Sequence, residues 1–78
     1  MRVYVNANPV DAPDGGTALD AVRVWSSSEG EALAAGERVL HDSRGLPVPA
    51  DTLLHGGAIF RVLPVRRRET GAAEGPDT

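Results

Sequence analysis

Gly56-Gly57-Ala58-Ile59-Phe60-Arg61-Val62-Leu63 is the densest apolar run in the sequence. A Gly-Gly turn followed by β-branched and aromatic residues predicts a strand. Because side chains alternate between the two faces of a strand, one face carries Phe60 and Val62, and the other carries Ile59, Arg61 and Leu63. Both faces hold apolar groups. We therefore expect this strand to lie inside a sheet, or to present its outer face to a partner.

The first residues predict a second strand and a hairpin. Arg2 to Asn6 alternates with period two, so that Val3 and Val5 point inward while Arg2, Tyr4 and Asn6 point outward. Turn residues follow at Ala7-Asn8-Pro9, and the alternation resumes from Val10 to Ala12. Two short antiparallel strands are expected here.

A helix is predicted directly after this hairpin. Thr17 can accept the backbone N–H two or three residues on, and Asp20 stands at the acid position of a capping box. The helix is expected from Ala18 to Ser26, with Ala18, Leu19, Val22 and Trp25 in one apolar stripe and Trp25 in the core. Ser26 to Gly30 is expected to be a loop, and Glu31 to Ala35 a brief helical turn that Gly36 ends.

The remaining residues predict a third strand and a proline-rich return. Glu37 to Asp42 is expected to be a strand closed by a turn at Asp42 to Gly45. Leu46 to Pro49 suits a short edge strand, and Ala50 to Leu54 a tight turn that packs Leu53 and Leu54 under the sheet. Pro64 is expected to end the last strand, since it has no N–H.

This element order predicts an α+β fold. A first and a last strand joined through a right-handed crossover helix lie most naturally in parallel at the centre of a sheet. We expect a mixed sheet of four or five strands packed on one helix, with a domain over residues 1–65 and a flexible C-terminal tail over residues 66–78.

Composition limits the functions that the chain can have. Seventy-eight residues allow a core too small for a cleft walled by two layers, so no catalytic residue and no enzyme activity are expected. Cysteine is absent, and His41 and His55 have no nearby carboxylate cluster, so no metal site is expected. A net charge of −3 disfavours nucleic acid as a partner. With no apolar leader and no membrane-spanning run, a monomeric cytoplasmic protein that does not bind membranes is expected.

Four motifs, taken in order, resemble a known family. They are Val3 to Asn6, Gly15 to Leu19, Asp51 to Gly57, and Phe60 to Val65. Over about residues 1–65 the chain resembles the β-grasp proteins of the ubiquitin-like group. The similarity is greatest to the bacterial sulfur carriers of thiamine and molybdopterin synthesis and to bacterial ubiquitin-like modifiers.

The resemblance implies that the working group is a C-terminal glycine carboxylate. In that family an ATP-dependent E1-like enzyme adenylates a terminal Gly-Gly, which then forms a thiocarboxylate or an amide bond, and the carrier itself holds no cofactor. In this sequence the diglycine would fall near Arg67-Arg68, and the chain continues to Thr78. The family pattern is therefore interrupted at the position that matters most for its chemistry.

Three alternatives remain open. A JAB-type metalloprotease could trim a precursor to expose Gly71, or less favourably Gly75, since Pro76 would hinder cleavage. The terminus would then pass from the E1-like enzyme to an E2-like enzyme or a target. Alternatively the chain could be a non-conjugating interaction module, or a plain sulfur carrier. Without family resemblance, Gly71 to Thr78 has the composition of an ordinary disordered end.

The resemblance also points to partner-binding residues. Arg66, Arg67 and Arg68 precede the proposed terminus, where the family places basic residues that meet acidic groups on enzymes. Tyr4, Ile59 and Leu63 are expected to form an apolar patch on the outer sheet surface, which activating enzymes grip in the family. Lysine is absent, so a modifier of this kind could not build lysine-linked chains on itself, and the amine of Met1 would be its one acceptor.

Overall fold

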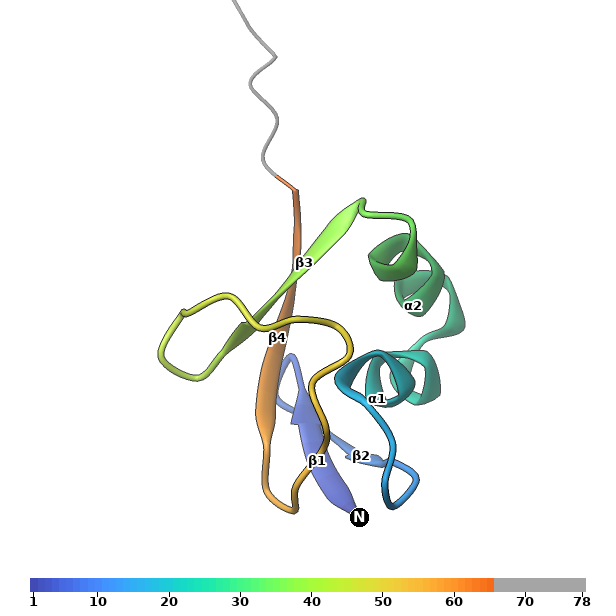
Figure 1. The fold of residues 1–78 in the computed structure, drawn as a ribbon, viewed down its shortest axis with the longest axis vertical. Helices are drawn as coiled ribbons and strands as arrows, with labels where there is room; N and C mark the ends of the chain where they lie inside the picture. Colours follow the sequence, from blue (N-terminus) through green and yellow to red (C-terminus); the bar gives the residue numbers. More distant parts are fainter. Residues whose placement is uncertain (66–78) are drawn as a thin grey trace, which may run out of the picture.

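The computed structural model describes residues 1–65, while residues 66–78 lie outside the described part of the chain. Six elements follow one another along the described chain: β1 (Arg2–Val5), β2 (Asn8–Asp11), α1 (Ala18–Trp25), α2 (Ser27–Ala34), β3 (Arg38–Asp42) and β4 (Ile59–Pro64). They form an α+β fold in which a four-stranded mixed sheet packs against two helices (Figure 1). The expectation of a single helix was wrong.

The strands lie in the order β2-β1-β4-β3. β1 pairs in parallel with β4, with Tyr4 opposite Ile59 and Val5 opposite Phe60. β2 pairs antiparallel with β1, and β3 antiparallel with β4. The predicted central pair of first and last strands is therefore confirmed. β4 ends at Pro64, which lies opposite Arg38, so the prediction that Pro64 ends the last strand is confirmed.

The β1–β2 hairpin turn begins one residue earlier than the predicted turn at Ala7-Asn8-Pro9. Its two-residue turn is Asn6-Ala7, with φ of 50° and 69° respectively, and β2 already begins at Asn8. Two consecutive positive φ values are typical of the tight turn that matches the twist of paired strands. Asn tolerates this conformation, whereas Ala7 adopts it against the steric preference of its Cβ. Pro9 fits within β2 because that strand lies at the edge of the sheet.

Both helices begin with side-chain caps. Thr17 and Asp20 form the predicted capping box at the start of α1. The predicted loop at Ser26 to Gly30 is instead helical, because the Ser26 hydroxyl accepts the Glu29 N–H at 3.3 Å and starts α2 directly after α1. Gly30 allows the two helices to approach closely, since a Cβ at this position would lie 2.4 Å from Cγ of Arg23.

The long connection between β3 and β4 has no strand. Leu46 to Pro49 was expected to form one, but only a single bridge joins Pro47 to His41. Proline lacks the N–H that a longer ladder would need. Leu54 is buried as predicted, whereas Leu53 is 69% exposed, which corrects the prediction that both pack under the sheet.

The core lies between the helices and one face of the sheet. Its buried residues include Val3 and Val5 from β1, Ala18 and Val22 from α1, Leu33 from α2, Leu40 from β3, and Phe60 and Val62 from β4. Trp25 is partly buried against this cluster. α1 contacts β1 and β2 while α2 contacts β3, which leaves the other sheet face without a covering helix (Figure 1). No helix within residues 1–65 has the length and apolar character needed to cross a membrane.

Candidate functional site

The uncovered face of the sheet carries the three predicted apolar contact residues. Tyr4 is 36% exposed and Ile59 47% exposed, and the two are register partners on the central parallel strands. Leu63 lies on the same face of β4, four residues beyond Ile59, and is half-buried. At roughly 3.3 Å per residue this separates them by about 13 Å. Tyr4 and Ile59 therefore form one apolar patch, and Leu63 belongs to a second one.

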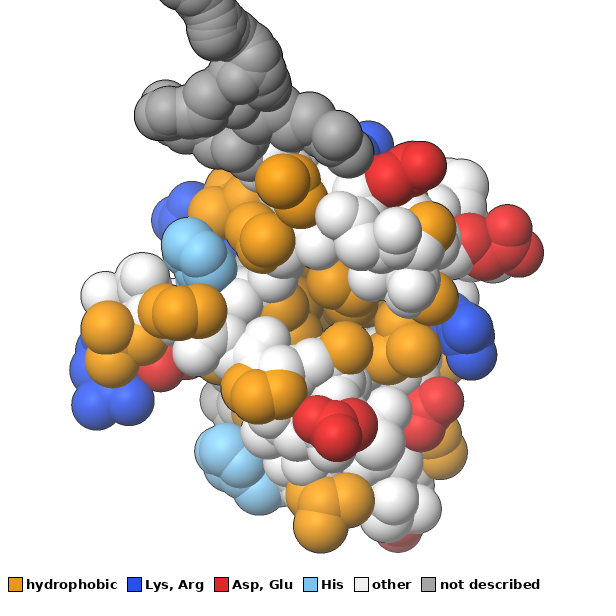
Figure 2. All heavy atoms as spheres, turned by 45° about the horizontal axis from the view of Figure 1, so that its top comes forward, with side chains coloured by type: hydrophobic (Ala, Val, Ile, Leu, Met, Phe, Trp, Pro, Cys, Tyr) orange, Lys and Arg blue, Asp and Glu red, His pale blue; other side chains and the backbone are white. Residues whose placement is uncertain are grey.

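The second patch lies where the described chain ends. Val39, His41, Leu63, Pro64 and Val65 line an open hollow of about 660 Å³ there. Val39 and Leu63 are register partners on β3 and β4. Figure 2 shows hydrophobic side chains gathered in this part of the surface with a histidine beside them. Val39 and His41 were not predicted as contact residues, although the alternation of β3 places both on the outer face.

One arginine lies between the two apolar patches. Arg61 is exposed, and its register partner across the β3–β4 pair is His41. Arg2, at the start of β1, is paired with Asp11 at 3.1 Å. Arg61, by contrast, makes no ion pair with any residue of the described chain. Within residues 1–65 the outer face therefore combines apolar patches with a positive charge that has no ion-pair partner, and a partner surface with apolar and acidic groups would complement it.

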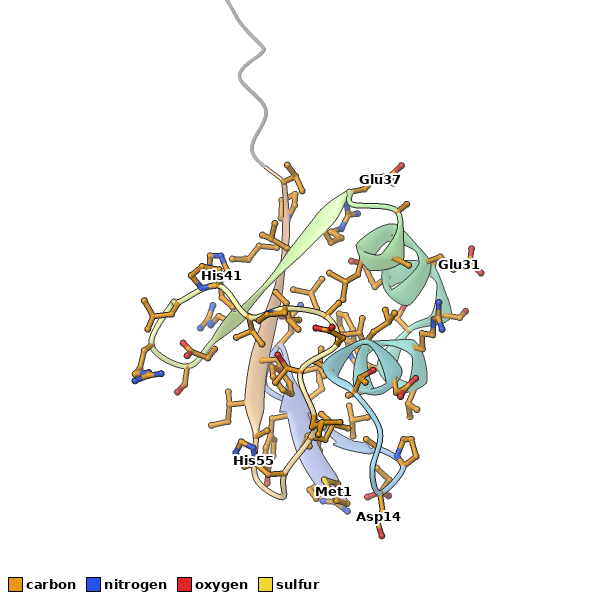
Figure 3. All side chains as sticks on the ribbon, in the orientation of Figure 1. Met1, Asp14, Glu31, Glu37, His41 and His55 are labelled. Atoms are coloured by element: carbon orange, nitrogen blue, oxygen red, sulfur yellow. The ribbon has the colours of Figure 1, made fainter. Side chains whose placement is uncertain are left out.

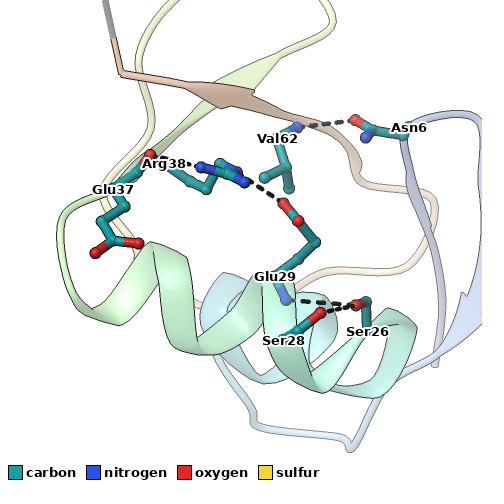
Figure 4. A network of polar contacts seen from close by, with 7 residues as sticks. All are labelled: Asn6, Ser26, Ser28, Glu29, Glu37, Arg38 and Val62. Atoms are coloured by element: carbon teal, nitrogen blue, oxygen red, sulfur yellow. Dashed lines mark hydrogen bonds and ion pairs between the residues drawn. The ribbon is translucent and has the colours of Figure 1, made fainter. Parts of the chain in front are cut away.

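A side chain in the hairpin turn fixes the position of β4. Oδ1 of Asn6 accepts the backbone N–H of Val62 at 2.9 Å (Figure 4), and the Asn6 N–H donates to the Phe60 carbonyl at 3.0 Å. These bonds extend the parallel pairing beyond the last residue of β1. Asn6 was predicted to be an outward-pointing strand residue. Its hydrogen bond to Val62 depends on its place in the hairpin turn, which the sequence did not predict.

The end of β4 is anchored to the body through β3. The Val65 N–H donates to the Glu37 carbonyl at 3.3 Å. Arg38, next in sequence, pairs through Nε with Glu29 of α2 at 2.9 Å, and both side chains are about 30% exposed (Figure 4). The chain is thus held in place up to Val65. The remaining predicted site residues, Arg66, Arg67, Arg68 and Gly71, lie outside the described residues.

The histidines do not lie together in a potential metal site. Figure 3 shows His41 on β3 and His55 on the loop before β4, at different places on the molecule. Within residues 1–65, no three His, Cys, Asp or Glu side chains are grouped so that they could hold a metal ion.

The amino group of Met1 is engaged in the fold. It donates to the Ala12 carbonyl at 2.6 Å and to the Asp14 carboxylate at 3.1 Å, and Figure 3 labels Met1 and Asp14 near each other. The Met1 side chain is 23% exposed. An acyl transfer to this amine would have to break both bonds.

The turn after β3 is organised by one carboxylate. Asp42 accepts the backbone N–H groups of Arg44 at 2.9 Å and Leu46 at 3.0 Å, as well as an Nη2–H of Arg44 at 3.1 Å. The hydrogen bond from Leu46 is the main cause that lowers the pKa of Asp42 below its ordinary value, with smaller contributions from Arg44. The Asp42 carboxylate therefore holds together the turn that follows β3.

Comparisons with known proteins add no family to this description. No family model matches the chain, and no curated protein or solved structure is significantly similar to it.

Proposed function

We propose that this chain is a ubiquitin-like β-grasp protein whose C-terminal carboxylate is activated by a separate E1-like enzyme. The observation that carries the proposal is the central parallel pair of β1 and β4, connected through the helices on one face of the sheet. This topology agrees with a β-grasp. The last described residue, Val65, lies far from the N-terminus (Figure 1). The proposed arm therefore starts at one end of the body.

The proposed chemistry starts at Gly71. A JAB-type metalloprotease hydrolyses the Gly71–Ala72 peptide bond, which leaves a glycine carboxylate. One carboxylate oxygen then attacks the α-phosphorus of ATP, so that an acyl-adenylate forms and pyrophosphate leaves. An amine or thiol of an E2-like enzyme or target attacks the acyl carbon, and AMP leaves. Glycine suits this role because its lack of a Cβ lets a chain end enter a narrow site.

The body has two tasks in this proposal. The bonds from Val65 to Glu37 and from Arg38 to Glu29 fix the point from which the arm starts. The outer sheet face supplies the recognition surface, with Tyr4, Ile59 and Leu63 as apolar contacts and Arg61 as the charged contact. Arg66, Arg67 and Arg68 are proposed to meet acidic groups of the enzyme along the arm.

A pyrophosphate-exchange assay tests the proposal. The chain ending at Gly71, the same chain with Gly71→Ala, and the full chain are each mixed with the E1-like enzyme encoded nearest to this gene. We expect ATP–pyrophosphate exchange with the chain ending at Gly71, and strongly reduced exchange with the other two. Equal exchange with all three would exclude Gly71 as the activated residue, and intact-mass analysis after protease treatment locates the cleavage independently.

A second function is favoured by the uncovered outer face alone. Because Tyr4, Ile59 and Arg61 belong to the body, a non-conjugating interaction module would use them without the tail. A chain ending at Val65 separates the two functions, since it should keep such binding and lose all activation. A plain sulfur carrier would instead form a thiocarboxylate at a trimmed glycine, which adds 16 Da by intact mass because sulfur replaces oxygen.

A further inference from the structure

The connection between β3 and β4 forms a notch on the side of the body. This side notch has a volume of about 370 Å³, and its lining includes Arg44, Val48, Leu53, His55 and Ile59. Ile59 is the first residue of β4, whereas the proposed arm follows the last, so the two features lie at opposite ends of this strand. Figure 1 shows the turn that follows β3 projecting sideways from the sheet.

Exposed apolar side chains are concentrated around the side notch. Five large hydrophobic residues are exposed in the described chain, namely Tyr4, Val24, Leu46, Leu53 and Ile59. Leu53 and Ile59 line the notch, and Leu46 lies on the turn that projects beside it. The notch also reaches core residues, since buried Ala58 and Phe60 contribute to its lining. Apolar surface gathered around a hollow in this way is typical of a binding site.

Both walls of the side notch are held by hydrogen bonds. On one side, Asp42 fixes the turn through the N–H groups of Arg44 and Leu46. On the other, the Gly57 N–H donates to the Arg2 carbonyl at 2.8 Å and the Ala58 N–H to the His55 carbonyl at 3.2 Å. A hollow whose walls are already fixed loses little conformational freedom when it is filled, which favours binding.

The rim of the side notch favours an acidic neighbour. Among the described residues that line the notch, Asp42 is the one carboxylate, and it already accepts hydrogen bonds from two backbone N–H groups and from Arg44. The Arg44 side chain is 76% exposed, so its guanidinium has donors left beyond the bond to Asp42. His55 is exposed on the opposite wall. A ligand carboxylate at this rim would therefore meet the remaining N–H donors of Arg44, while the Asp42 carboxylate is already hydrogen-bonded within its own turn.

We propose that the side notch binds a segment of a partner protein that inserts one aliphatic or aromatic side chain and carries a carboxylate beside it. The apolar side chain would contact Leu53 and Ile59, and the carboxylate would accept hydrogen bonds from Arg44. The proposal goes beyond the proposed function, because it uses neither Gly71 nor an activating enzyme.

Selection from a phage-displayed library of random peptides tests this inference on the full chain. We expect enriched peptides to share one large apolar residue next to Asp or Glu. A synthetic peptide of that consensus should bind the Leu53→Ser variant about tenfold more weakly than the wild-type chain. Arg44→Gln should weaken binding by a similar factor, and should have little effect on a peptide whose acid is replaced by Gln.

Val24→Ser is the matched control. Val24 is 55% exposed, like the notch residues, but lies on α1, so this variant should bind the peptide as the wild type does. Thermal melts establish that all three variants are folded. The inference is overturned if no peptide is enriched, if the peptides lack an acid, or if Leu53→Ser and Val24→Ser bind equally well.

Discussion

The two faces of the sheet are made from alternating residues of the same strands, yet they differ in exposure. On β4, Phe60 is 5% exposed and its neighbour Ile59 is 47% exposed. On β1, Val3 and Val5 are fully buried, while Tyr4 between them reaches the surface. Because the helices cover only the inner face, the alternation separates the residues that hold the fold together from the residues that a partner can reach.

The largest expected effect comes from shortening adjacent residues on opposite faces. Phe60→Ala should lower the free energy of unfolding by about 3–5 kcal/mol, because it removes a buried ring and leaves a cavity. Ile59→Ala should lower the free energy of unfolding by about 1 kcal/mol or less, because the Ile59 side chain is already half exposed to solvent. Urea unfolding followed by Trp25 fluorescence measures both changes.

Phe60→Leu extends this measurement if the alanine variant does not fold. This variant keeps an apolar side chain in the core, and its free energy of unfolding should fall by about 1 kcal/mol. Equal losses for Phe60→Ala and Ile59→Ala would contradict the assignment of inner and outer faces.

The hairpin turn gives a second test of how the two sheet faces differ. Its length sets the β1–β2 register, in which Val3 and Val5 point inward. Ala7 has φ of 69°, a conformation that costs a residue with a Cβ about 1–2 kcal/mol and glycine almost nothing. After the greater flexibility of glycine in the unfolded chain is subtracted, Ala7→Gly should stabilise the fold by up to about 1 kcal/mol. A thermal melt monitored by circular dichroism measures the gain.

The same substitution in a helix is the control for this prediction. Ala34 is exposed on α2 in a helical conformation, so Ala34→Gly should destabilise the fold by up to about 1 kcal/mol. If Ala7→Gly and Ala34→Gly have the same sign, the strain assigned to the turn is absent.

The sequence predicted the parts of the fold that depend on local pattern. Period-two alternation placed Val3 and Val5 inward, and the capping box of Thr17 and Asp20 fixed the start of α1, because both signals depend on near neighbours. The parallel pairing of β1 with β4 followed from the handedness of crossover connections. Tyr4 and Ile59 were likewise placed on the outer face by alternation.

The errors occurred where a local signal was missed or where contacts distant in sequence decide the structure. A three-serine segment after α1 favours a loop by composition, but Ser26 caps α2 and Gly30 allows α2 to pack closely on Arg23, so the chain is helical from Ser27. Asn6 and Val62 are far apart in sequence, so their hydrogen bond could not be anticipated. The side notch was missed for the same reason, since it forms only when the turn after β3 and the loop before β4 come together.

The smallest expected effect concerns Asp42, at the border between the sheet and the side notch. Hydrogen bonds lower the pKa of this carboxyl below its ordinary value of 3.8. Its ionised form therefore stabilises the fold above that ordinary value, and the stabilisation is lost as the pH falls through the lowered pKa of the folded state. Asp42→Asn still accepts backbone N–H groups through Oδ1 but cannot titrate, so it should flatten the dependence of the melting temperature on pH below about pH 4.

Melting temperatures of the wild type and Asp42→Asn at several pH values between about 2.5 and 7 measure this change. Ser43→Ala, in the same turn, leaves the carboxyl in place and should keep the wild-type slope. Because the Asp42 side chain is partly exposed to solvent, the difference between the slopes should correspond to a smaller effect than the losses expected from the inner face. A slope unchanged in Asp42→Asn would mean that the turn is held by backbone geometry alone, and that this wall of the side notch does not depend on the Asp42 charge.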